Sequence, residues 1–347
     1  MRHHDAKNNT LLYILIFILS LILVIYGGDI FVDNAVKIAK KSKIPIVIIG
    51  ATIVSIATTL PELIVSSVAS AQGVFGLAVC NAIGSVICNT ALIGGLSMAV
   101  LPTKIREKSS NFKYYMLLFS LLILFLSGFD SKGKYNISLF ESVILLIMFV
   151  LFIAFNIIDA MKQKRRKVDP DDYTIIENKD EAEEKPINQK FILLISLFLL
   201  GAAMVAVGAY GMVESAKYIA SKMGVSDTLI GLTIVAVGTS LPELVTTITA
   251  VRKKNSELGY GNIVGANILN ILLIIGASGL FAGKSGLPIM KYTFLFCIPL
   301  AIVMSIVFLV PLILKNKSYR WQGVSLLALY GCYLITLIVL TIQGFAI

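Results

Sequence analysis

A fourteen-residue stretch that begins at Gly50 occurs again in the second half of the chain, where it begins at Gly231. The copies read Gly-Ala-Thr-Ile-Val-Ser-Ile-Ala-Thr-Thr-Leu-Pro-Glu-Leu and Gly-Leu-Thr-Ile-Val-Ala-Val-Gly-Thr-Ser-Leu-Pro-Glu-Leu, with nine of fourteen positions identical. Each copy carries one glutamate, Glu62 or Glu243, inside an otherwise apolar run. The duplication predicts two structurally related halves.

The similarity continues without gaps at the spacing from Gly50 to Gly231, which we call the repeat offset. The further matched pairs are Asp33 with Glu214, Lys41 with Lys222, Asn81 with Asn262, Gly84 with Gly265, Asn89 with Asn270 and Gly95 with Gly276. A repeat of this length is far more specific than a short motif.

The composition excludes a soluble protein, because 57% of the residues are hydrophobic and 14% are charged. A helix needs about 20 mostly apolar residues to cross a bilayer. Ten segments meet this requirement: 11–36, 44–71, 75–101, 112–129, 138–160, 190–219, 227–251, 259–281, 289–314 and 321–345. We therefore predict an all-α polytopic membrane protein with ten transmembrane helices.

Each half contains five predicted spans, and five is an odd number, so the second half must enter the membrane from the opposite side. We predict two inverted five-helix repeats, residues 1–161 and 190–347, joined by the charged linker 162–189. In transporters built this way, the substrate and ion sites lie near the midplane, where the repeats meet on interrupted helices.

The net charge of +10 does not indicate nucleic-acid binding, because the basic residues follow the membrane. Of the 30 Lys and Arg residues, 22 fall in the loops after the first, third, fifth, seventh and ninth spans. An excess of Lys and Arg marks cytoplasmic loops. We expect a monomer in the lipid bilayer of the cell membrane, with both termini outside and linker 162–189 cytoplasmic.

The lone glutamates indicate function, because a charged group at bilayer depth costs a few kcal/mol. Pro61 and Pro242 precede Glu62 and Glu243 directly. Proline lacks an amide hydrogen and breaks a helix, and irregular backbone survives in a membrane only inside protein or beside a polar cavity. We predict a cation site between the two halves.

Helical spacing predicts which side chains join each glutamate. Thr58 and Thr59 lie four and three residues before Glu62, and Thr239 and Ser240 have the same relation to Glu243. The following helix of the first half adds Ser85 and Asn89, and its counterpart adds Asn267 and Asn270. All of these ligands offer oxygen, which Ca²⁺ and Na⁺ prefer, whereas Zn²⁺ or Cu⁺ would require His or Cys.

Helix packing is the alternative role for small polar residues in a membrane. We prefer it for Ser66, Ser67, Thr246 and Thr247, and we prefer helix-end or interface roles for Asp33, Glu141, Asp159 and Glu214. Packing does not explain Glu62 and Glu243. Two carboxylates about 5 Å apart repel by about 3 kcal/mol at an effective dielectric of 20, so an empty site should either protonate one of them or recruit cations.

These motifs resemble the two α-repeats of the cation/Ca²⁺ antiporter superfamily. The matching residues are Ala-Thr-Thr-Leu-Pro-Glu and Gly-Thr-Ser-Leu-Pro-Glu, followed by Cys-Asn-Ala-Ile-Gly-Ser and Gly-Asn-Ile-Val-Gly-Ala-Asn. The chain is most similar to the compact prokaryotic Na⁺/Ca²⁺ exchangers, and the resemblance covers all ten predicted helices.

The resemblance implies a central Ca²⁺ site made by Glu62 and Glu243 with the main-chain oxygens of Thr58 and Thr239. It also implies flanking Na⁺ sites. One contains Ser85, Thr239, Ser240, Glu62 and the Ala236 carbonyl; the other contains Thr58, Thr59, Glu243 and the Ser55 carbonyl. Asn89 and Asn270 complete the centre.

The chain departs from the family pattern at three positions. Ala57 stands where glycine is usual, Ala266 stands opposite Ser85 of the first copy, and Asn270 replaces the aspartate of some relatives. One flanking Na⁺ site therefore lacks a hydroxyl, and the pocket keeps two carboxylates rather than three. These departures leave the Na⁺ stoichiometry and any K⁺ dependence open.

The function predicted from the sequence is Na⁺/Ca²⁺ antiport by alternating access, without a cofactor and without enzymatic activity. The first and sixth spans, with Gly27 and Gly208 at matched positions, are candidates to slide against the remaining helices. Ca²⁺/H⁺ antiport through the same glutamates is the alternative. A membrane-embedded hydrolase is disfavoured, because the Gly-x-Gly-Asp arrangement of intramembrane aspartyl proteases is absent.

Overall fold

The computed structural model describes residues 2–41, 56, 59–103, 110–129, 134–166, 190–252 and 256–343. Nearly all of these residues are helical. The helices of the first half are α1 (Arg2–Lys41), α4 (Leu60–Ala71), α5 (Phe75–Ile87), the π-helix η2 (Cys88–Gly94), α6 (Gly95–Val100), α7 (Ser110–Ser127) and α8 (Leu139–Arg166).

The second half follows the same order. Its elements are α9 (Phe191–Met223), α10 (Asp227–Ile230), the π-helix η5 (Gly231–Val235), α11 (Ala236–Thr239), α12 (Leu241–Arg252), α13 (Ser256–Leu269), the π-helix η6 (Asn270–Ile275), α14 (Gly276–Ala282), the 3-10 turn η7 (Gly283–Ser285), the π-helix η8 (Thr293–Cys297), α15 (Ile298–Lys315) and α16 (Arg320–Ile342). Strands β1 (Asn136–Ile137) and β2 (Leu287–Pro288) pair antiparallel and connect the two halves.

Helix boundaries recur at the repeat offset that relates the sequence copies. Helix α12 begins and ends at the positions that match the start and end of α4, and α16 begins at the position that matches the start of α8. The π-helices η2 and η6 also lie at matched positions. The sequence repeat is therefore accompanied by a repeat of local structure.

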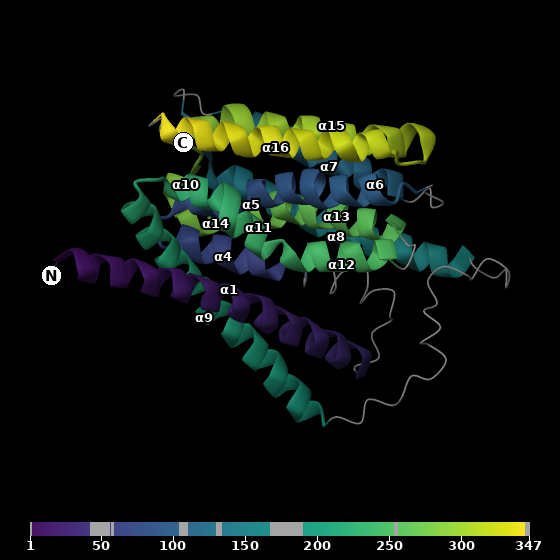
Figure 1. Ribbon diagram of the computed structural model, residues 1–347. Coiled ribbons are helices and arrows are strands. Elements are labelled where there is room, and N and C mark those ends of the chain that lie inside the picture. The colour runs from purple at the N-terminus through teal and green to yellow at the C-terminus, as the bar shows by residue number, and fades with distance from the viewer. Residues whose placement is uncertain are drawn as a thin grey trace.

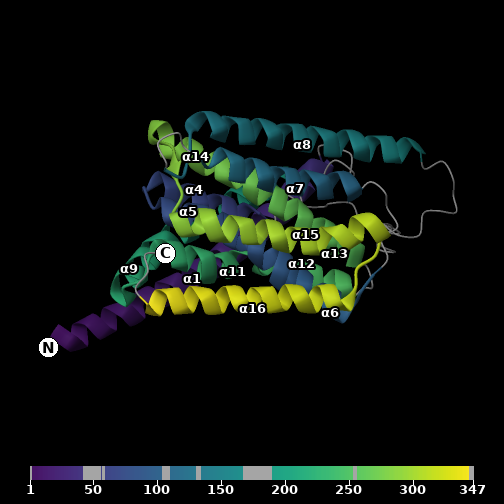
Figure 2. The same cartoon turned by 90° about the horizontal axis from the view of Figure 1, so that it is seen from above.

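The helices lie in layers (Figure 1). Helices α1 and α9 form a pair beside the remaining bundle, and α15 and α16 lie at its opposite side. Figure 2 shows α8 and α16 at two further edges, with α5, α13 and α15 between them. The larger hydrophobic core joins α5, η2, α7, α13, η6, α15 and α16, and a smaller core joins α1, α4, α5 and α9.

Seven helices of the described residues are long and apolar enough to cross a membrane, and a bent pair, 227–239 with 241–248, makes an eighth. The other two predicted segments contain the shorter apolar helices Leu60–Ala71 and Phe112–Ser127. Residues 44–55, 57 and 58 of the predicted span 44–71 lie outside the described residues. The membrane class is thus supported, and the count of ten spans remains a prediction.

The labelled termini and the ends of several helices lie at opposite ends of the bundle. Figure 1 has both labelled termini at the left, whereas α6, α8 and α12 end at the right, where α15 also turns into α16. At that right end, the Thr103 amide donates to Ser318 Oγ at 2.8 Å and the Ser318 amide donates to the Thr103 carbonyl at 2.9 Å.

Helices α1 and α9 pack closely because glycine lines their crossing. An added Cβ at Gly201 would lie 2.5 Å from the Phe31 amide nitrogen, and one at Gly208 would lie 2.8 Å from the Ser20 carbonyl oxygen. Small residues allow such close approach between membrane helices. Tyr13 and Tyr218 add a stacked ring pair, with centroids 3.8 Å apart.

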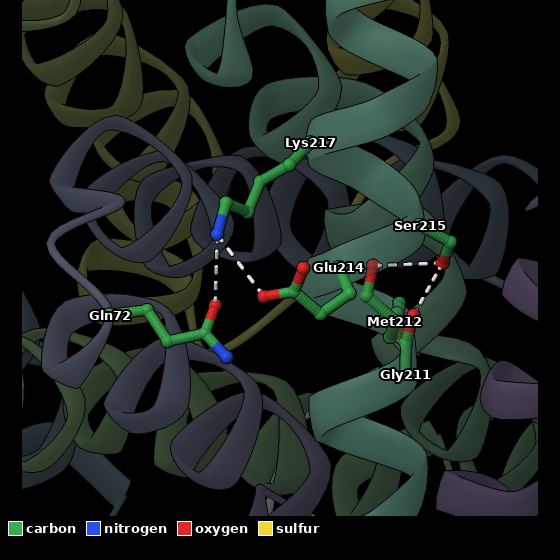
Figure 3. A network of polar contacts seen from close by, with 6 residues as sticks. All are labelled: Gln72, Gly211, Met212, Glu214, Ser215 and Lys217. Atoms are coloured by element: carbon green, nitrogen blue, oxygen red, sulfur yellow. Dashed lines mark hydrogen bonds and ion pairs between the residues drawn. The ribbon is translucent and has the colours of Figure 1, made fainter.

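A polar network connects α9 to the turn after α4 (Figure 3). Lys217 Nζ donates to Glu214 Oε1 at 3.1 Å and to Gln72 Oε1 at 3.5 Å. Both charged side chains are more than a third exposed, so the ion pair adds little stability. Glu141 has the predicted helix-end role, because it accepts from the Ser138 amide before α8, whereas the interface or helix-end role of Glu214 stays a prediction.

We predict that Gly201→Ala lowers the stability of the protein, because its methyl group would overlap the backbone of α1. Overpacking of this kind costs about 1 to 3 kcal/mol. Gly331→Ala in α16 is the matched control, since no atom lies within 4 Å of its added Cβ. Thermal unfolding of the purified protein in detergent measures both variants. Equal transition temperatures would contradict the close crossing.

Candidate cation-binding site

The signature segment of the second half is a broken helix. Helix α11 ends at Thr239 and α12 begins at Leu241, with a bend of 45° between the two parts. Pro242 is the second residue of α12, where its missing amide hydrogen is tolerated. The predicted interruption at Pro242 is confirmed. In the first half α4 begins at Leu60, and Pro61 occupies the same position.

Glu62 and Glu243 lie in the first turns of α4 and α12 and are fully buried. The contact of Ser240, three residues before Glu243, with Glu62 brings the two acidic helix starts together. The positive end of each helix dipole lies at the N-terminus and stabilises a nearby carboxylate. This arrangement lets two acidic groups remain inside the protein, and it leaves negative charge that a cation would neutralise.

A hydrogen bond joins the two broken helices directly. Ser240 Oγ, from the break before α12, donates to Glu62 Oε1 at 3.3 Å. The second carboxylate oxygen, Oε2, is buried and has no hydrogen-bond partner. The repeats therefore meet at the glutamate of the first half, and an acceptor oxygen remains available there.

Asn81 of α5 connects both broken helices. Its Nδ2 donates to Ser66 Oγ at 2.9 Å and to the Glu62 carbonyl at 3.3 Å, and its Oδ1 accepts from Thr239 Oγ1 at 3.2 Å. Asn81 is fully buried. A single amide thus holds the α4 backbone at the glutamate against Thr239.

Ser85, one turn further along α5, faces the same break. Its hydroxyl lies 3.5 Å from the Ala236 carbonyl, which also accepts from the Ser240 amide at 3.1 Å. These contacts make neighbours of three residues assigned to one flanking site: Ser85, Ala236 and Ser240.

Asn89 and Asn270 begin matched π-helical segments. Asn89 is the second residue of η2, and Asn270 is the first residue of η6. π-Helical turns frequently occur at functional sites. Asn89 Nδ2 donates to Asn267 Oδ1 at 3.2 Å, so the first half contacts the second here as well.

All of the predicted site residues that the structure describes are buried. They are Thr59, Glu62, Ser85, Asn89, Ala236, Thr239, Ser240, Glu243 and Asn270, none more than 1% exposed. Ser55 and Thr58, and also Ala57, lie outside the described residues. The packing role predicted for Ser66 is supported, since it is buried and accepts from Asn81, whereas Thr246 is exposed and accepts from Asn262.

Asn81 and Thr90 were not among the residues selected from the sequence. The match of Asn81 with Asn262 at the repeat offset was the available signal for the first. Thr90 has Ile271 as its counterpart, so the repeat gives no signal for it.

The donor atoms of the site are all oxygens. No group of three or more His, Cys, Asp or Glu side chains gathers anywhere in the part of the chain that the structure describes. Two carboxylates with hydroxyl, amide and carbonyl oxygens suit a hard cation such as Ca²⁺ or Na⁺.

A multi-pass helical membrane protein with a buried acidic pair on broken helices belongs to the class of ion transporters. Comparison with known proteins identifies the family. The family described as "Sodium/calcium exchanger protein" matches residues 12–158 and 193–339, and the two stretches are related by the repeat offset at both ends. The chain belongs to this family of membrane antiporters for sodium and calcium.

Individual relatives cover nearly the whole chain. The sodium/calcium exchanger MaX1 of Methanosarcina acetivorans is 32% identical over 93% of this chain and 97% of its own length. An uncharacterized membrane protein of Methanocaldococcus jannaschii is 33% identical over 90% of this chain and 94% of its own. A solved structure of the sodium-calcium exchanger NCX_Mj, soaked with 10 mM Na⁺ and no Ca²⁺, superposes with a TM-score of 0.61 at 31% identity and covers 94% and 99% of the two chains.

We predict that Asn81→Leu destabilises the protein, because it leaves the buried Ser66 hydroxyl without its amide partner, whereas the Thr239 hydroxyl keeps the Val235 carbonyl. Each unsatisfied buried group costs about 1 to 3 kcal/mol. Ser305→Ala is the control, since the Ser305 hydroxyl is buried without a hydrogen bond. Thermal unfolding in detergent should separate the two variants by several degrees. If Asn81→Leu and Ser305→Ala unfold at the same temperature, Asn81 does not stabilise the contact between the helices.

Proposed function

We propose that this protein exchanges Ca²⁺ against Na⁺ across the cell membrane by alternating access, with one site near the midplane between Glu62 and Glu243. One observation carries the proposal. Both carboxyl groups are buried, each lies at the start of a matched helix, and Ser240 of the second half contacts Glu62 of the first. The family assignment supports the same two ions.

Glu62 and Glu243, with the main-chain oxygens of Thr58 and Thr239, would hold Ca²⁺. Na⁺ would bind at two flanking positions and at the centre. The proposed Na⁺ ligands are Ser55, Thr58, Thr59, Glu62, Ser85, Asn89, Ala236, Thr239, Ser240, Glu243 and Asn270. The contacts between Ser85 and the Ala236 carbonyl, and between Ser240 and Glu62, support one flanking position.

Two carboxylates explain why the ions exchange. Their two negative charges balance one Ca²⁺ or two Na⁺, so occupation by either cargo excludes the other. A third Na⁺ would leave the loaded site positively charged and make the exchange electrogenic. Ca²⁺/H⁺ antiport would use the same carboxylates, but the named exchanger relatives are described with sodium, which favours the sodium-coupled reaction.

The architecture we infer is two inverted five-helix repeats, residues 1–161 and 190–347, with 162–189 as the linker. The recurrence of helix boundaries and π-helices at the repeat offset supports two repeats. The opposite directions of α1 and α9 in Figure 1 support the inversion.

The orientation we infer has both termini outside and linker 162–189 in the cytoplasm. It follows from the 22 Lys and Arg residues assigned to one side. The positions of both termini at one end, and of the ends of α6, α8 and α12 at the other, agree with this assignment.

The moving part would be the pair of α1 and α9. This pair packs through glycine at its own crossing and contributes only to the smaller hydrophobic core. A displacement of the pair against the larger core would open the site to one side of the membrane and then to the other.

We predict that Glu62→Gln and Glu243→Gln each reduce Na⁺-driven ⁴⁵Ca²⁺ uptake by at least about a hundredfold, because each removes one of two charges that bind the ion. Vesicles that contain the protein are loaded with Na⁺ and diluted into Na⁺-free medium with ⁴⁵Ca²⁺. Glu214→Gln, which removes a half-exposed carboxylate outside the site, should transport at the normal rate.

Parallel vesicles loaded with K⁺, or carrying a pH gradient, distinguish the alternatives. If the pH gradient drives Ca²⁺ uptake and Na⁺ does not, the protein is a Ca²⁺/H⁺ antiporter and the proposed sodium coupling is wrong. Uptake that persists at the normal rate in both glutamate variants would exclude this site.

A further inference from the structure

A chain of three buried side chains crosses between the halves beside the proposed site. Asn267 Nδ2 donates to Thr90 Oγ1 at 2.8 Å, and Asn267 Oδ1 accepts from Asn89 Nδ2 at 3.2 Å. None of the three is more than 1% exposed. The chain therefore lies entirely inside the protein, where hydrogen-bond partners decide which way an amide turns.

The hydrogen bonds of this chain give the Asn89 amide its orientation in the structure. A side-chain amide has one end that donates and one end that accepts. Asn267 donates to Thr90 from its NH₂ end and presents its oxygen to Asn89, which donates from its own NH₂ group. The carbonyl oxygen of Asn89 is thereby turned away from Asn267, and it is buried without a hydrogen-bond partner.

An unpaired buried carbonyl oxygen costs about 1 to 3 kcal/mol. A bound cation would remove this cost. The segment η2, which contains Asn89, packs against α12, which contains Glu243, so this oxygen belongs to the same region as the acidic pair.

The second half provides an internal comparison, because Asn270 is the counterpart of Asn89. The counterparts of Asn267 and Thr90 are Val86 and Ile271, which cannot form hydrogen bonds with their side chains. Neither Oδ1 nor Nδ2 of Asn270 has a hydrogen-bond partner. The two halves thus carry the same asparagine, and only the first half's asparagine has an orienting partner.

We propose that Asn267 is a positioning residue that holds the Asn89 carbonyl oxygen as a fixed Na⁺ ligand, whereas the Asn270 amide remains free to turn. The proposal rests on the proposed function, in which Asn89 is a ligand for Na⁺ and not for Ca²⁺. An oriented ligand binds more tightly because less freedom is lost when the ion arrives.

Asn267→Val, which installs the residue of the matched position, tests the proposal in the full-length protein in proteoliposomes. The Na⁺ concentration for half-maximal exchange should rise about fivefold, as expected for the loss of one hydrogen-bonded orientation. The half-saturating Ca²⁺ concentration should change less than about twofold. A merely structural role would shift both constants together, or would lower the thermal stability and leave both unchanged.

Thr90 supplies a second test that does not alter an amide. Thr90→Val removes the acceptor for Asn267 and should also raise the Na⁺ requirement, whereas Thr90→Ser keeps the hydroxyl and should behave like the unmodified protein. The double variant of Asn267→Val and Thr90→Val should match Asn267→Val alone, because both changes act through one chain of hydrogen bonds. If Asn267→Val does not fold, the pair of Thr90 variants decides.

An unchanged Na⁺ requirement in Asn267→Val or in Thr90→Val, with normal exchange, overturns the positioning role and leaves the proposed function intact. Absence of Na⁺-driven uptake in the unmodified protein overturns the proposed function instead. In that case the positioning role of Asn267 is tested with the same variants, by measuring how their thermal stability in detergent depends on Na⁺. Loss of Na⁺ stabilisation in Asn267→Val supports its role, and equal stabilisation contradicts it.

Discussion

The repulsion between two buried carboxylates is the constraint on which the rest of the site depends. Glu62 and Glu243 could not remain in an apolar interior without groups that offset their charge. The structure supplies a helix N-terminus at each glutamate, and at Glu62 it adds the Ser240 hydroxyl from the other half. A helix begins at the Leu-Pro-Glu motif of each half, at Leu60 and Leu241, and this start places each glutamate in a first turn.

The sequence predicted the parts of this arrangement that recur or that follow a local rule. The repeat offset located matched helices, and the Leu-Pro-Glu motif located the helix break at Pro242. The membrane class followed from composition. Within the predicted spans 44–71 and 112–129, the described residues form the apolar helices Leu60–Ala71 and Phe112–Ser127.

The contacts between distant segments could not be predicted in the same way. No local pattern encodes that Asn81 of α5 reaches Thr239 of α11, or that Asn267 of α13 reaches Thr90. The π-helices η2 and η6 were also not predicted, since no proline or glycine pair marks their start at Cys88 and Asn270. Such features depend on how helices pack, which periodicity does not describe.

A duplicated fold with identical site residues would give the two halves equal roles in holding ions. This chain departs from that equality at two adjacent positions: Ser85 and Val86 in the first half correspond to Ala266 and Asn267 in the second. In each half the polar residue of this pair contacts a segment of the other half, Ser85 at the Ala236 carbonyl and Asn267 at Asn89. The polar contacts thus gather around the Ser85 and Asn89 side of the site. If the site opens first to one side of the membrane and then to the other, as we propose, these differences make the ion ligands of the two halves unequal, while the acidic pair is common to both openings.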